Sequence, residues 1–297
     1  MINCKLFYIL SKYIYFGHIV YLQPLTIRIE IKELDECFYL YKELQTMITS
    51  YLDRSWLISI ILNSLLLGFA MIIPKKLLTF SGYLHAWLLG VLIWWLLGWQ
   101  GYILIMSYFI IGSAITYVGI SKKEKAGIAE KRSGTRGPEN VWGSGLTALF
   151  CALGTLFSNP FYTKLFILGY VASISTKLSD TVASELGKVY GKNTFLITTL
   201  RPASPGTEGA ISLEGTLAGF IASVLIALVG FFINFINLNE VSYCVISAFF
   251  ATNVESVIGA TLQNRVSWMN NDVVNIINTL IGALIAFFLY FLETNLF

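Results

Sequence analysis

The sequence is poor in charge, cysteine and histidine. Charged residues make up 12% of the 297 residues, and the formal net charge of +3 is too small to indicate a nucleic-acid partner. The four cysteines form no CxxC pair and the two histidines are isolated, so neither a disulfide framework nor a His/Cys metal site is predicted. We expect His85, inside an apolar run, to be a packed and hydrogen-bonded residue.

Apolar surface is what the sequence has in excess. Hydrophobic residues make up 56% of the chain and the mean hydropathy is +0.70, more than a soluble domain could bury. Helices rise 1.5 Å per residue, so about eight runs are long enough to cross roughly 30 Å of hydrocarbon. These runs lie near Trp56–Ile73, Tyr83–Leu97, Gly101–Ile120, Trp142–Phe157, Phe161–Leu178, Leu213–Ile236, Val241–Leu262 and Val273–Phe291. The pattern predicts an all-α integral membrane protein, a polytopic bundle of about eight transmembrane helices.

The chain before the first run differs from the rest. It has a Tyr-rich stretch, Leu6–Leu22, and a charged amphipathic stretch, Arg28–Glu43. Polar residues such as Lys12 interrupt the first stretch, which favours an interfacial helix over a ninth span. We therefore predict an N-terminal extension over residues 1–54 and a polytopic membrane domain over 55–297; a start codon assigned too early is the alternative.

Basic residues collect on one side of the predicted bundle. When the eight runs are threaded alternately through a bilayer, twelve Lys and Arg residues fall on one side and only Lys164 lies in the opposite connections. By the positive-inside rule, the basic side is cytoplasmic, or stromal in a plastid. The polar sequence motifs lie on the same side, which predicts one polar site there.

The first of these motifs is the loop 131–143. Its guanidinium groups suit phosphate oxygens, and its glycines let the backbone approach a ligand closely. A basic loop that contacts anionic lipid headgroups is the alternative. The candidate phosphate-binding residues are Lys131, Arg132, Arg136 and Asn140.

The second motif ends the fifth predicted helix. Lys177, Asp180 and Ser184 recur at helical spacing on one face, with Glu185 on the neighbouring flank. Ionised groups near a bilayer are costly, and two carboxylates with hydroxyls suit a metal and phosphate site, since Mg²⁺ prefers oxygen ligands. A purely structural Lys177–Asp180 ion pair is the alternative.

The third and fourth motifs come from the loop before the sixth helix and from the seventh. Prolines and glycines in 202–209 predict a turn whose backbone amides could hold an anion, with Ser212 as an N-cap. Glu214 follows in the first turn, where a carboxylate is favoured even without a function. Glu255 lies inside an apolar span, which favours a functional role over packing alone.

These stretches resemble a family of membrane proteins defined by domain of unknown function ninety-two, which includes transmembrane protein 19 and plant phytyl-phosphate kinase. The resemblance covers Trp56 to Phe291 and rests on four ordered motifs. The motifs are Lys131-Arg-x-Gly-x-Arg-Gly with Asn140, Ser179-Asp-Thr-x-Ala-Ser-Glu-Leu-Gly187, Pro205-Gly-Thr-x-Gly-Ala-x-Ser-Leu-x-Gly-Thr, and Gly259-Ala-Thr-Leu-Gln263 with Asn275. The chain looks like a cyanobacterial or plastid-like member. One departure is Glu255-Ser256, where relatives often carry Asp-Ser.

Two of the stretches also look like those of CTP-dependent polyprenol kinases. They are Asp180-Thr-x-Ala-Ser-x-Leu-Gly-x-x-Tyr-Gly191 and Leu213-Glu-Gly-Thr-Leu-Ala-Gly219. Together the resemblances imply a prenyl-phosphate kinase that converts phytyl phosphate to phytyl diphosphate, in salvage towards tocopherol and phylloquinone. CTP or another nucleoside triphosphate would be the co-substrate.

The resemblance also implies roles for particular residues. Catalytic roles fall to Lys177, Asp180 and Glu185, and a Mg²⁺ ion would lie at Asp180 and Glu255. Phosphates would contact Lys131, Arg132, Arg136, Asn140, Gly206, Thr207 and Gly209. Further site residues are Ser184, Glu214, Glu255, Gln263 and Asn275.

Two rival functions stay open. A transporter or channel would use the membrane carboxylates as an ion or proton path with access from both faces. A CTP-dependent lipid cytidylyltransferase would use the same groups but release pyrophosphate. In each case we expect a multi-pass protein of a bacterial plasma or thylakoid membrane, or of a plastid membrane, in contact with membrane lipid.

Overall fold

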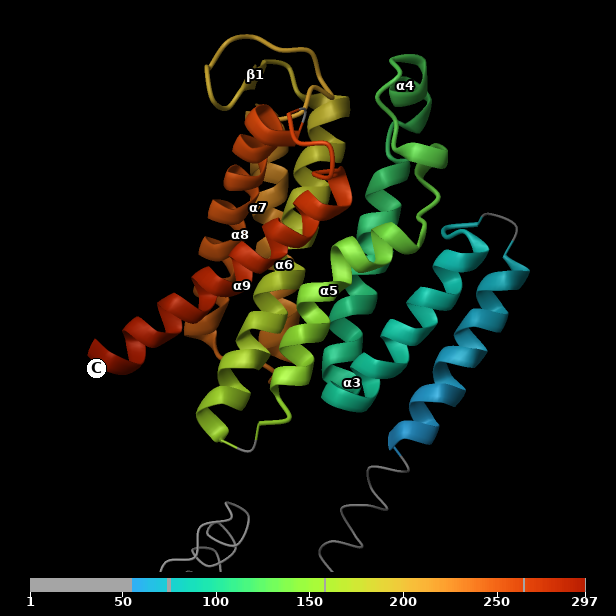
Figure 1. The fold of residues 1–297 in the computed structure, drawn as a ribbon, viewed down its shortest axis with the longest axis vertical. Coiled ribbons are helices and arrows are strands. Elements are labelled where there is room, and N and C mark those ends of the chain that lie inside the picture. The colour runs from blue at the N-terminus through green and yellow to red at the C-terminus, as the bar shows by residue number, and fades with distance from the viewer. Residues whose placement is uncertain (1–54, 74–75, 158, 264, 297) are drawn as a thin grey trace, which may run out of the picture. The chain divides into compact units, whose positions relative to one another are not determined.

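A computed structural model describes residues 55–73, 76–157, 159–263 and 265–296 (Figure 1). The predictions for residues 1–54 lie outside this range. The described elements are the helix Ser55–Ile72, α3 (Phe80–Tyr117), α4 (Ile120–Lys125), η1 (Lys131–Gly134), α5 (Pro138–Gly154), α6 (Pro160–Tyr190), β1 (Thr194–Leu196), β2 (Ala210–Ser212), α7 (Leu213–Phe232), α8 (Leu238–Ile258), the π-helix η2 (Gly259–Gln263) and α9 (Asn271–Leu296). Most of the described residues are helical, and the one pair of strands is only three residues long on each side, which confirms the predicted helical class.

The element α3 is a helical hairpin. Its Gly98 has a φ of 64°, a conformation that interrupts a helix and that glycine adopts without strain. Arg136 contacts both arms, since its carbonyl accepts a hydrogen bond from Thr79 at 2.9 Å and its guanidinium donates one to Tyr108 at 3.3 Å. A straight helix would hold residues 79 and 108 roughly 40 Å apart. The chain therefore reverses at Gly98, where the sequence predicts a break between two runs.

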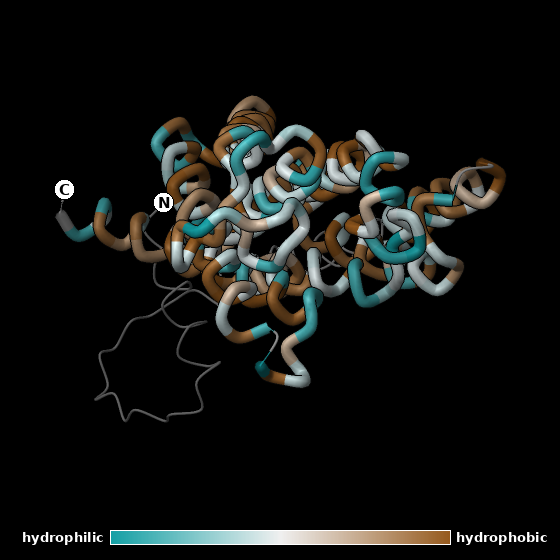
Figure 2. Tube along the Cα trace, turned by 90° about the horizontal axis from the view of Figure 1, so that it is seen from above, coloured by the Kyte–Doolittle hydropathy of each residue, from teal (hydrophilic) through white to brown (hydrophobic). Residues whose placement is uncertain are grey.

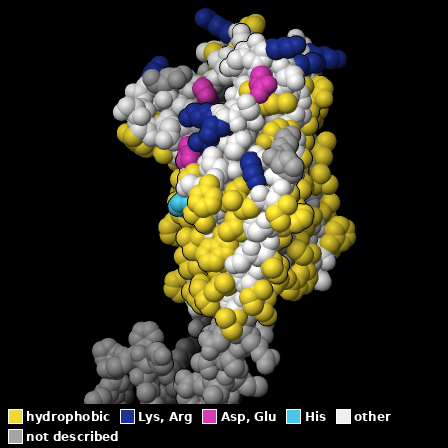
Figure 3. Space-filling view, turned by 90° about the vertical axis from the view of Figure 1, so that its right-hand side faces the viewer, with side chains coloured by type: hydrophobic (Ala, Val, Ile, Leu, Met, Phe, Trp, Pro, Cys, Tyr) yellow, Lys and Arg dark blue, Asp and Glu magenta, His cyan; other side chains and the backbone are white. Residues whose placement is uncertain are grey.

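Five of the described helices are long and apolar enough to cross a membrane: Ser55–Ile72, α3, α7, α8 with η2, and α9. Helix α5 has 17 residues, and α6 has 31 residues with several charged side chains near its end. On the face drawn in Figure 3, hydrophobic side chains cover the bundle and charged side chains gather towards one end. Figure 2 shows hydrophilic segments lying over the helices at that end. The count of eight crossings stays a prediction.

Helix α6 is the centre of the bundle. It packs against α3, α5, α7, α8 and α9, and its residues 168–182 are buried. Helix α7 approaches it through Gly215 and Gly219, where an added Cβ atom would lie 2.6 Å from the Ala183 carbonyl and 2.7 Å from that of Ser179. This close approach confirms the packing interpretation of the Gly215–Gly219 spacing. It also holds the polar end of α6 in place.

Local contacts fix the starts of the helices around the site. Helix α5 begins at Pro138, before its predicted start at Trp142, because Asn140 and Gly137 form a capping pair with an N···O distance of 2.9 Å. Ser212 caps α7 by accepting the Gly215 N–H at 3.1 Å, as predicted. His85 accepts a hydrogen bond from Trp142 at 2.8 Å, which confirms that it is a packed residue.

Candidate functional site

A cavity of about 420 Å³ lies at the polar end of the described bundle. Its walls come from α3, the segment 128–136, α5, α6, the turn 205–212, α7, α8 and α9. It brings together twelve of the residues singled out from sequence, drawn from all four motifs. They are Lys131, Arg136, Asn140, Lys177, Asp180, Ser184, Glu185, Gly206, Thr207, Gly209, Glu255 and Asn275.

Three other candidates lie outside this cavity. Arg132 forms an ion pair with Glu139. Glu214 accepts the Lys192 N–H at 3.4 Å in the first turn of α7. Gln263, in η2, lines an adjoining hollow that shares Lys131, Glu208 and Asn271 with the cavity.

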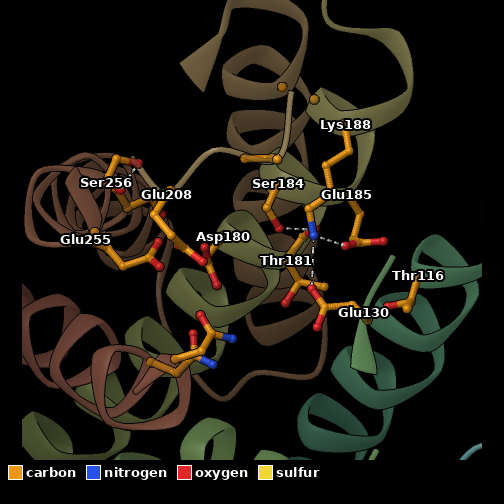
Figure 4. Close-up of a pocket in the computed structure, with 18 of the residues that line it drawn as sticks. Thr116, Glu130, Asp180, Thr181, Ser184, Glu185, Lys188, Glu208, Glu255 and Ser256 are labelled. Carbon is orange, nitrogen blue, oxygen red and sulfur yellow. Dashed lines mark hydrogen bonds and ion pairs between the residues drawn. The ribbon is translucent and has the colours of Figure 1, made fainter. Parts of the chain in front are cut away.

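Two carboxyl groups lie close together in the wall of the cavity. Asp180 of α6 and Glu255 of α8 lie within hydrogen-bonding reach of each other, and Figure 4 shows Glu208 and Ser256 beside them. Lys177 donates to Asp180 at 2.5 Å and to the Asn275 side-chain oxygen at 2.7 Å. The predicted Lys177–Asp180 ion pair is thus present, and it also faces the cavity. Adjacent carboxylates repel unless a proton or a cation lies between them.

Glu185 lies in a different environment. It is 1% exposed and forms ion pairs with Lys123 and, at 2.9 Å, with Lys188 (Figure 4 shows Lys188). Lys188 also pairs with Glu130 at 3.0 Å. Each Glu185 oxygen therefore has a lysine partner. Of the two carboxylates that sequence offered as companions for Asp180, the structure brings Glu255 to it and ties Glu185 to lysines.

Two cations of the cavity wall have no carboxylate partner among the described residues. Lys131 and Arg136 form no ion pair there, whereas Lys123, Lys177 and Lys188 each do. The Arg136 guanidinium lies 5.6 Å from the centre of the Tyr108 ring, and its backbone is fixed by hydrogen bonds to residues 77 and 79. A guanidinium held in one orientation and a nearby ammonium can bind phosphate oxygens.

The turn 205–209 lies against α8. Its Gly206 and Gly209 have φ values of 85° and 75°, which glycine adopts readily, and an added Cβ on Gly209 would meet Ala260. The Thr207 amide and hydroxyl both donate to the Ser204 carbonyl, so they are used within the turn. Within the described residues, the amides of Gly206 and Gly209 donate no hydrogen bond, and they remain the candidate anion donors.

Sequence reasoning missed several residues of the wall. Glu130 precedes Lys131 in the basic loop, Lys188 continues the Asp180–Ser184 face at a spacing of four, and Glu208 lies inside the Gly-rich turn. Partial desolvation raises the pKa of Glu208. Burial raises the pKa of Glu130, but the charge of and hydrogen bond from Lys188, together with the charge of Lys177, lower it, and the net pKa is lowered. Helical spacing could have identified Lys188. Glu130 and Glu208 lie in loops, and only the folded structure shows that they line the cavity.

The carboxylate pair suits a hard cation in part. No group of three His, Cys, Asp or Glu side chains within the described ranges could hold a metal ion alone. Asp180 and Glu255 offer carboxylate oxygens, the ligand type that Mg²⁺ prefers, and Mg²⁺ usually takes its remaining ligands from water and substrate phosphates. The donor set fits Mg²⁺ bound together with a phosphate ligand.

These features define a helical membrane bundle with a polar cavity at one end. The chain belongs to the integral membrane protein family DUF92, whose model matches residues 63–283. It is an integral, multi-pass membrane protein. No solved structure matches it.

Several curated proteins are similar over most of the chain. An uncharacterized membrane protein of Synechocystis is 60% identical over 78% of this chain and 90% of its own. Protein VTE6, chloroplastic, of Arabidopsis thaliana is 46% identical over 70% of this chain and 64% of its own. An uncharacterized membrane protein of Methanocaldococcus jannaschii is 32% identical over 74% of this chain and 89% of its own. The relatives include cyanobacterial and chloroplast proteins, in keeping with the expected type of membrane.

Proposed function

We propose that this protein is a prenyl-phosphate kinase that transfers a phosphoryl group from a nucleoside triphosphate, CTP first, to phytyl phosphate. The observation that carries the proposal is the cavity itself. Lys131 and Arg136, two cations without a carboxylate partner in the part of the chain that the structure describes, face the same space as the Asp180–Glu255 pair. Phosphoryl transfer depends mainly on positioning and on neutralising charge, and these are the groups that do both.

The acceptor oxygen needs little activation. A prenyl phosphate is already an anion near neutral pH, so its oxygen attacks the terminal phosphorus of the donor, the bond to the leaving diphosphate breaks, and no proton has to be removed. That agrees with a cavity whose buried carboxylates are paired: Glu185 with lysines and Asp180 with Lys177. In this proposal Glu185 positions the wall and does not act as a base.

The remaining groups divide between charge neutralisation and orientation. Lys131 and Arg136 bind phosphate oxygens, and the Gly206 and Gly209 amides add neutral donors. Lys177, fixed by Asp180 and Asn275, holds the Asp180 carboxylate towards Glu255. When Mg²⁺ is bound at Asp180 and Glu255, it neutralises charge on the donor phosphates.

The adjoining hollow suits the nucleoside part of the donor. The hollow lies beside the cations that would bind the phosphates, since Lys131 and Glu208 line both spaces. Its wall carries amide side chains, Gln263 and Asn270, which can donate and accept hydrogen bonds with a base. Arg265 adds a positive charge. Gln263 does not line the phosphate-binding cavity, and in this placement it would contact the nucleoside of the donor.

The test is phosphoryl transfer by the purified protein in liposomes, with phytyl phosphate, Mg²⁺ and terminally labelled CTP or ATP. We expect label in phytyl diphosphate, and the more efficient nucleotide identifies the donor. Release of pyrophosphate with a cytidylyl product would instead establish the cytidylyltransferase. Absence of transfer with every donor and prenyl phosphate would overturn the kinase and favour transport.

A further inference from the structure

The cavity has an apolar end that the proposed chemistry does not use. Most of its wall is polar, but Phe220 of α7 and Phe249 of α8 also line it. These two side chains are 44% and 41% exposed, respectively, and belong to the outer surface of helices that are apolar enough to cross a membrane. The next residues along the chain, Ile221 and Phe250, are exposed as well. The cavity therefore reaches the outer face of the bundle at α7 and α8.

Both helices change from polar to aromatic along the cavity. Ser212, the N-cap of α7, and Thr216 and Phe220 within α7 follow a spacing of four, and all three residues line the cavity. Phe220 lies roughly 12 Å further along the helix axis than Ser212, away from the polar end.

Helix α8 runs in the opposite direction and shows the same gradient. Ser256 and Thr252 line the cavity nearer the polar end, and Phe249 lies roughly 10 Å deeper than Ser256. The Thr252 hydroxyl is buried and has no hydrogen-bond partner among the described residues. Two antiparallel helices thus place hydroxyls at one level and phenyl rings at another.

The surrounding elements fix where this end can open. Helix α6 forms the rear wall, since Gly215 and Gly219 hold α7 against its backbone. The turn before α7 crosses to α8, where Gly209 lies against Ser256 and Ala260. The polar end is thereby covered between the two helices, and the side towards Phe220 and Phe249 faces the membrane.

We propose that the gap between α7 and α8, flanked by Phe220 and Phe249, is a lateral opening that admits a single-chain isoprenoid phosphate directly from the membrane. The inference rests on the proposed function and names how its acceptor binds. The phosphate reaches Arg136 and the Asp180–Glu255 pair, while the chain stays between the two rings and in lipid. A long chain that reached the cavity through water would lose its favourable burial in the membrane, so lateral access removes that cost.

The first test narrows the opening. Phe220→Trp and Phe249→Trp should raise KM for phytyl phosphate on the order of tenfold, because an apolar pocket discriminates by shape. KM for dimethylallyl phosphate, whose short chain does not reach the rings, and KM for the nucleotide should stay unchanged. Ile221→Trp and Phe250→Trp are the matched controls, since these neighbours do not line the cavity. An equal rise in KM for phytyl phosphate and dimethylallyl phosphate, or the same rise in the control variants, would overturn the proposed opening.

The second test does not need turnover. Photoreactive benzoylphenylalanine at position 220 or 249 should crosslink to radiolabelled phytyl phosphate, and unlabelled phytyl phosphate should compete. Benzoylphenylalanine at position 250 should crosslink only to bulk lipid, so unlabelled phytyl phosphate should not reduce its crosslinking. If unlabelled phytyl phosphate reduces the crosslinking but no phosphoryl transfer is found, the lateral opening is supported and the kinase proposal is rejected. If the wild type transfers phosphate but crosslinking at positions 220 and 249 is not reduced by unlabelled phytyl phosphate, the lateral opening is rejected and the kinase proposal stands.

Discussion

At the scale of single residues, Asp180 differs from the other buried carboxylates in its partners. Asp180→Asn removes one negative charge from the Asp180–Glu255 pair but keeps the size of the side chain. We expect kcat for phytyl phosphate to fall at least about a hundredfold, the scale seen when one charge-stabilising group is lost. Insertion and monodispersity in detergent should not change. A variant that keeps its turnover would remove Asp180 from the site.

Glu255 supplies the companion variants. Glu255→Asp keeps the carboxylate and shortens the side chain by one methylene, so it should keep most of the turnover, whereas Glu255→Gln should lose it together with Mg²⁺ dependence. The measurement is kcat as a function of Mg²⁺ concentration for both variants. Equal activity of the two would show that the charge of Glu255 is not used.

The two arginines of the basic loop make a matched pair. Arg136 lines the cavity without an ion pair in the described part of the chain, whereas Arg132 does not line it and pairs with Glu139. Arg136→Ala should raise KM for the phosphate substrates about tenfold, since a charge-assisted hydrogen bond is lost. Arg132→Ala should change KM less than about twofold, because an exposed ion pair contributes little. Steady-state kinetics would contradict this if both variants behaved alike.

At the scale of elements, the contact between α6 and α7 depends on glycine. Gly219→Ala places a Cβ atom against Ser179 and Ala183, an overpacking that costs about 1–3 kcal/mol. Gly68→Ala makes the same change in the helix Ser55–Ile72, where nothing lies within 4 Å of the new atom. Thermal unfolding in detergent should show a lower midpoint for the first variant only. A midpoint equal to that of the wild type would mean that α7 can move away without loss.

The segment after α4 is fastened to α6 by the Glu130–Lys188 ion pair, which depends on pH. Burial raises the Glu130 pKa, but the ion pair with Lys188 and the nearby Lys177 charge together lower it below its ordinary 4.5. A carboxyl with a lowered pKa stabilises the fold above its unfolded pKa, and that contribution is lost as pH falls through the folded value. The midpoint of thermal unfolding should therefore decrease between about pH 5 and pH 3. Glu130→Gln should flatten this decrease; parallel curves would contradict the assignment.

The sequence predicted the helices more accurately than the ion-pair partners of individual side chains. Hydrophobic runs located the helices, and the break near Gly98 followed from their spacing. Helical periodicity placed Lys177, Asp180 and Ser184 on one face correctly. It could not show that Glu185, one residue further, pairs with Lys123 of the separate helix α4, because that pairing depends on how α3 and α4 return over α6. Contacts of this kind are fixed by tertiary packing.

At the scale of the whole membrane domain, the connections between helices gather at two ends. The cavity joins the segments 128–136, 205–212 and 271–272 at one end. At the other, Gln100 donates to the Ile233 carbonyl at 3.0 Å, and Lys164 pairs with Glu240 at 3.2 Å. Successive connections therefore alternate between ends, the arrangement that the predicted threading requires. It places the cavity on the same end as the basic loops.

This alternation gives a direct test of sidedness and of the number of crossings. Glu124 and Asn239 are exposed and are separated by α5, α6 and α7, so three crossings put them on opposite sides of the membrane. Single cysteines at these positions, in a chain with Cys4 and Cys37 changed to Ser, should react differently with an impermeant maleimide. Cys151 and Cys244 are buried and should stay silent. We expect labelling from the cytoplasmic side at position 124 and from the opposite side at 239. Labelling of both from one side would mean that one of the three helices does not cross, and the cavity would then lose its assigned side.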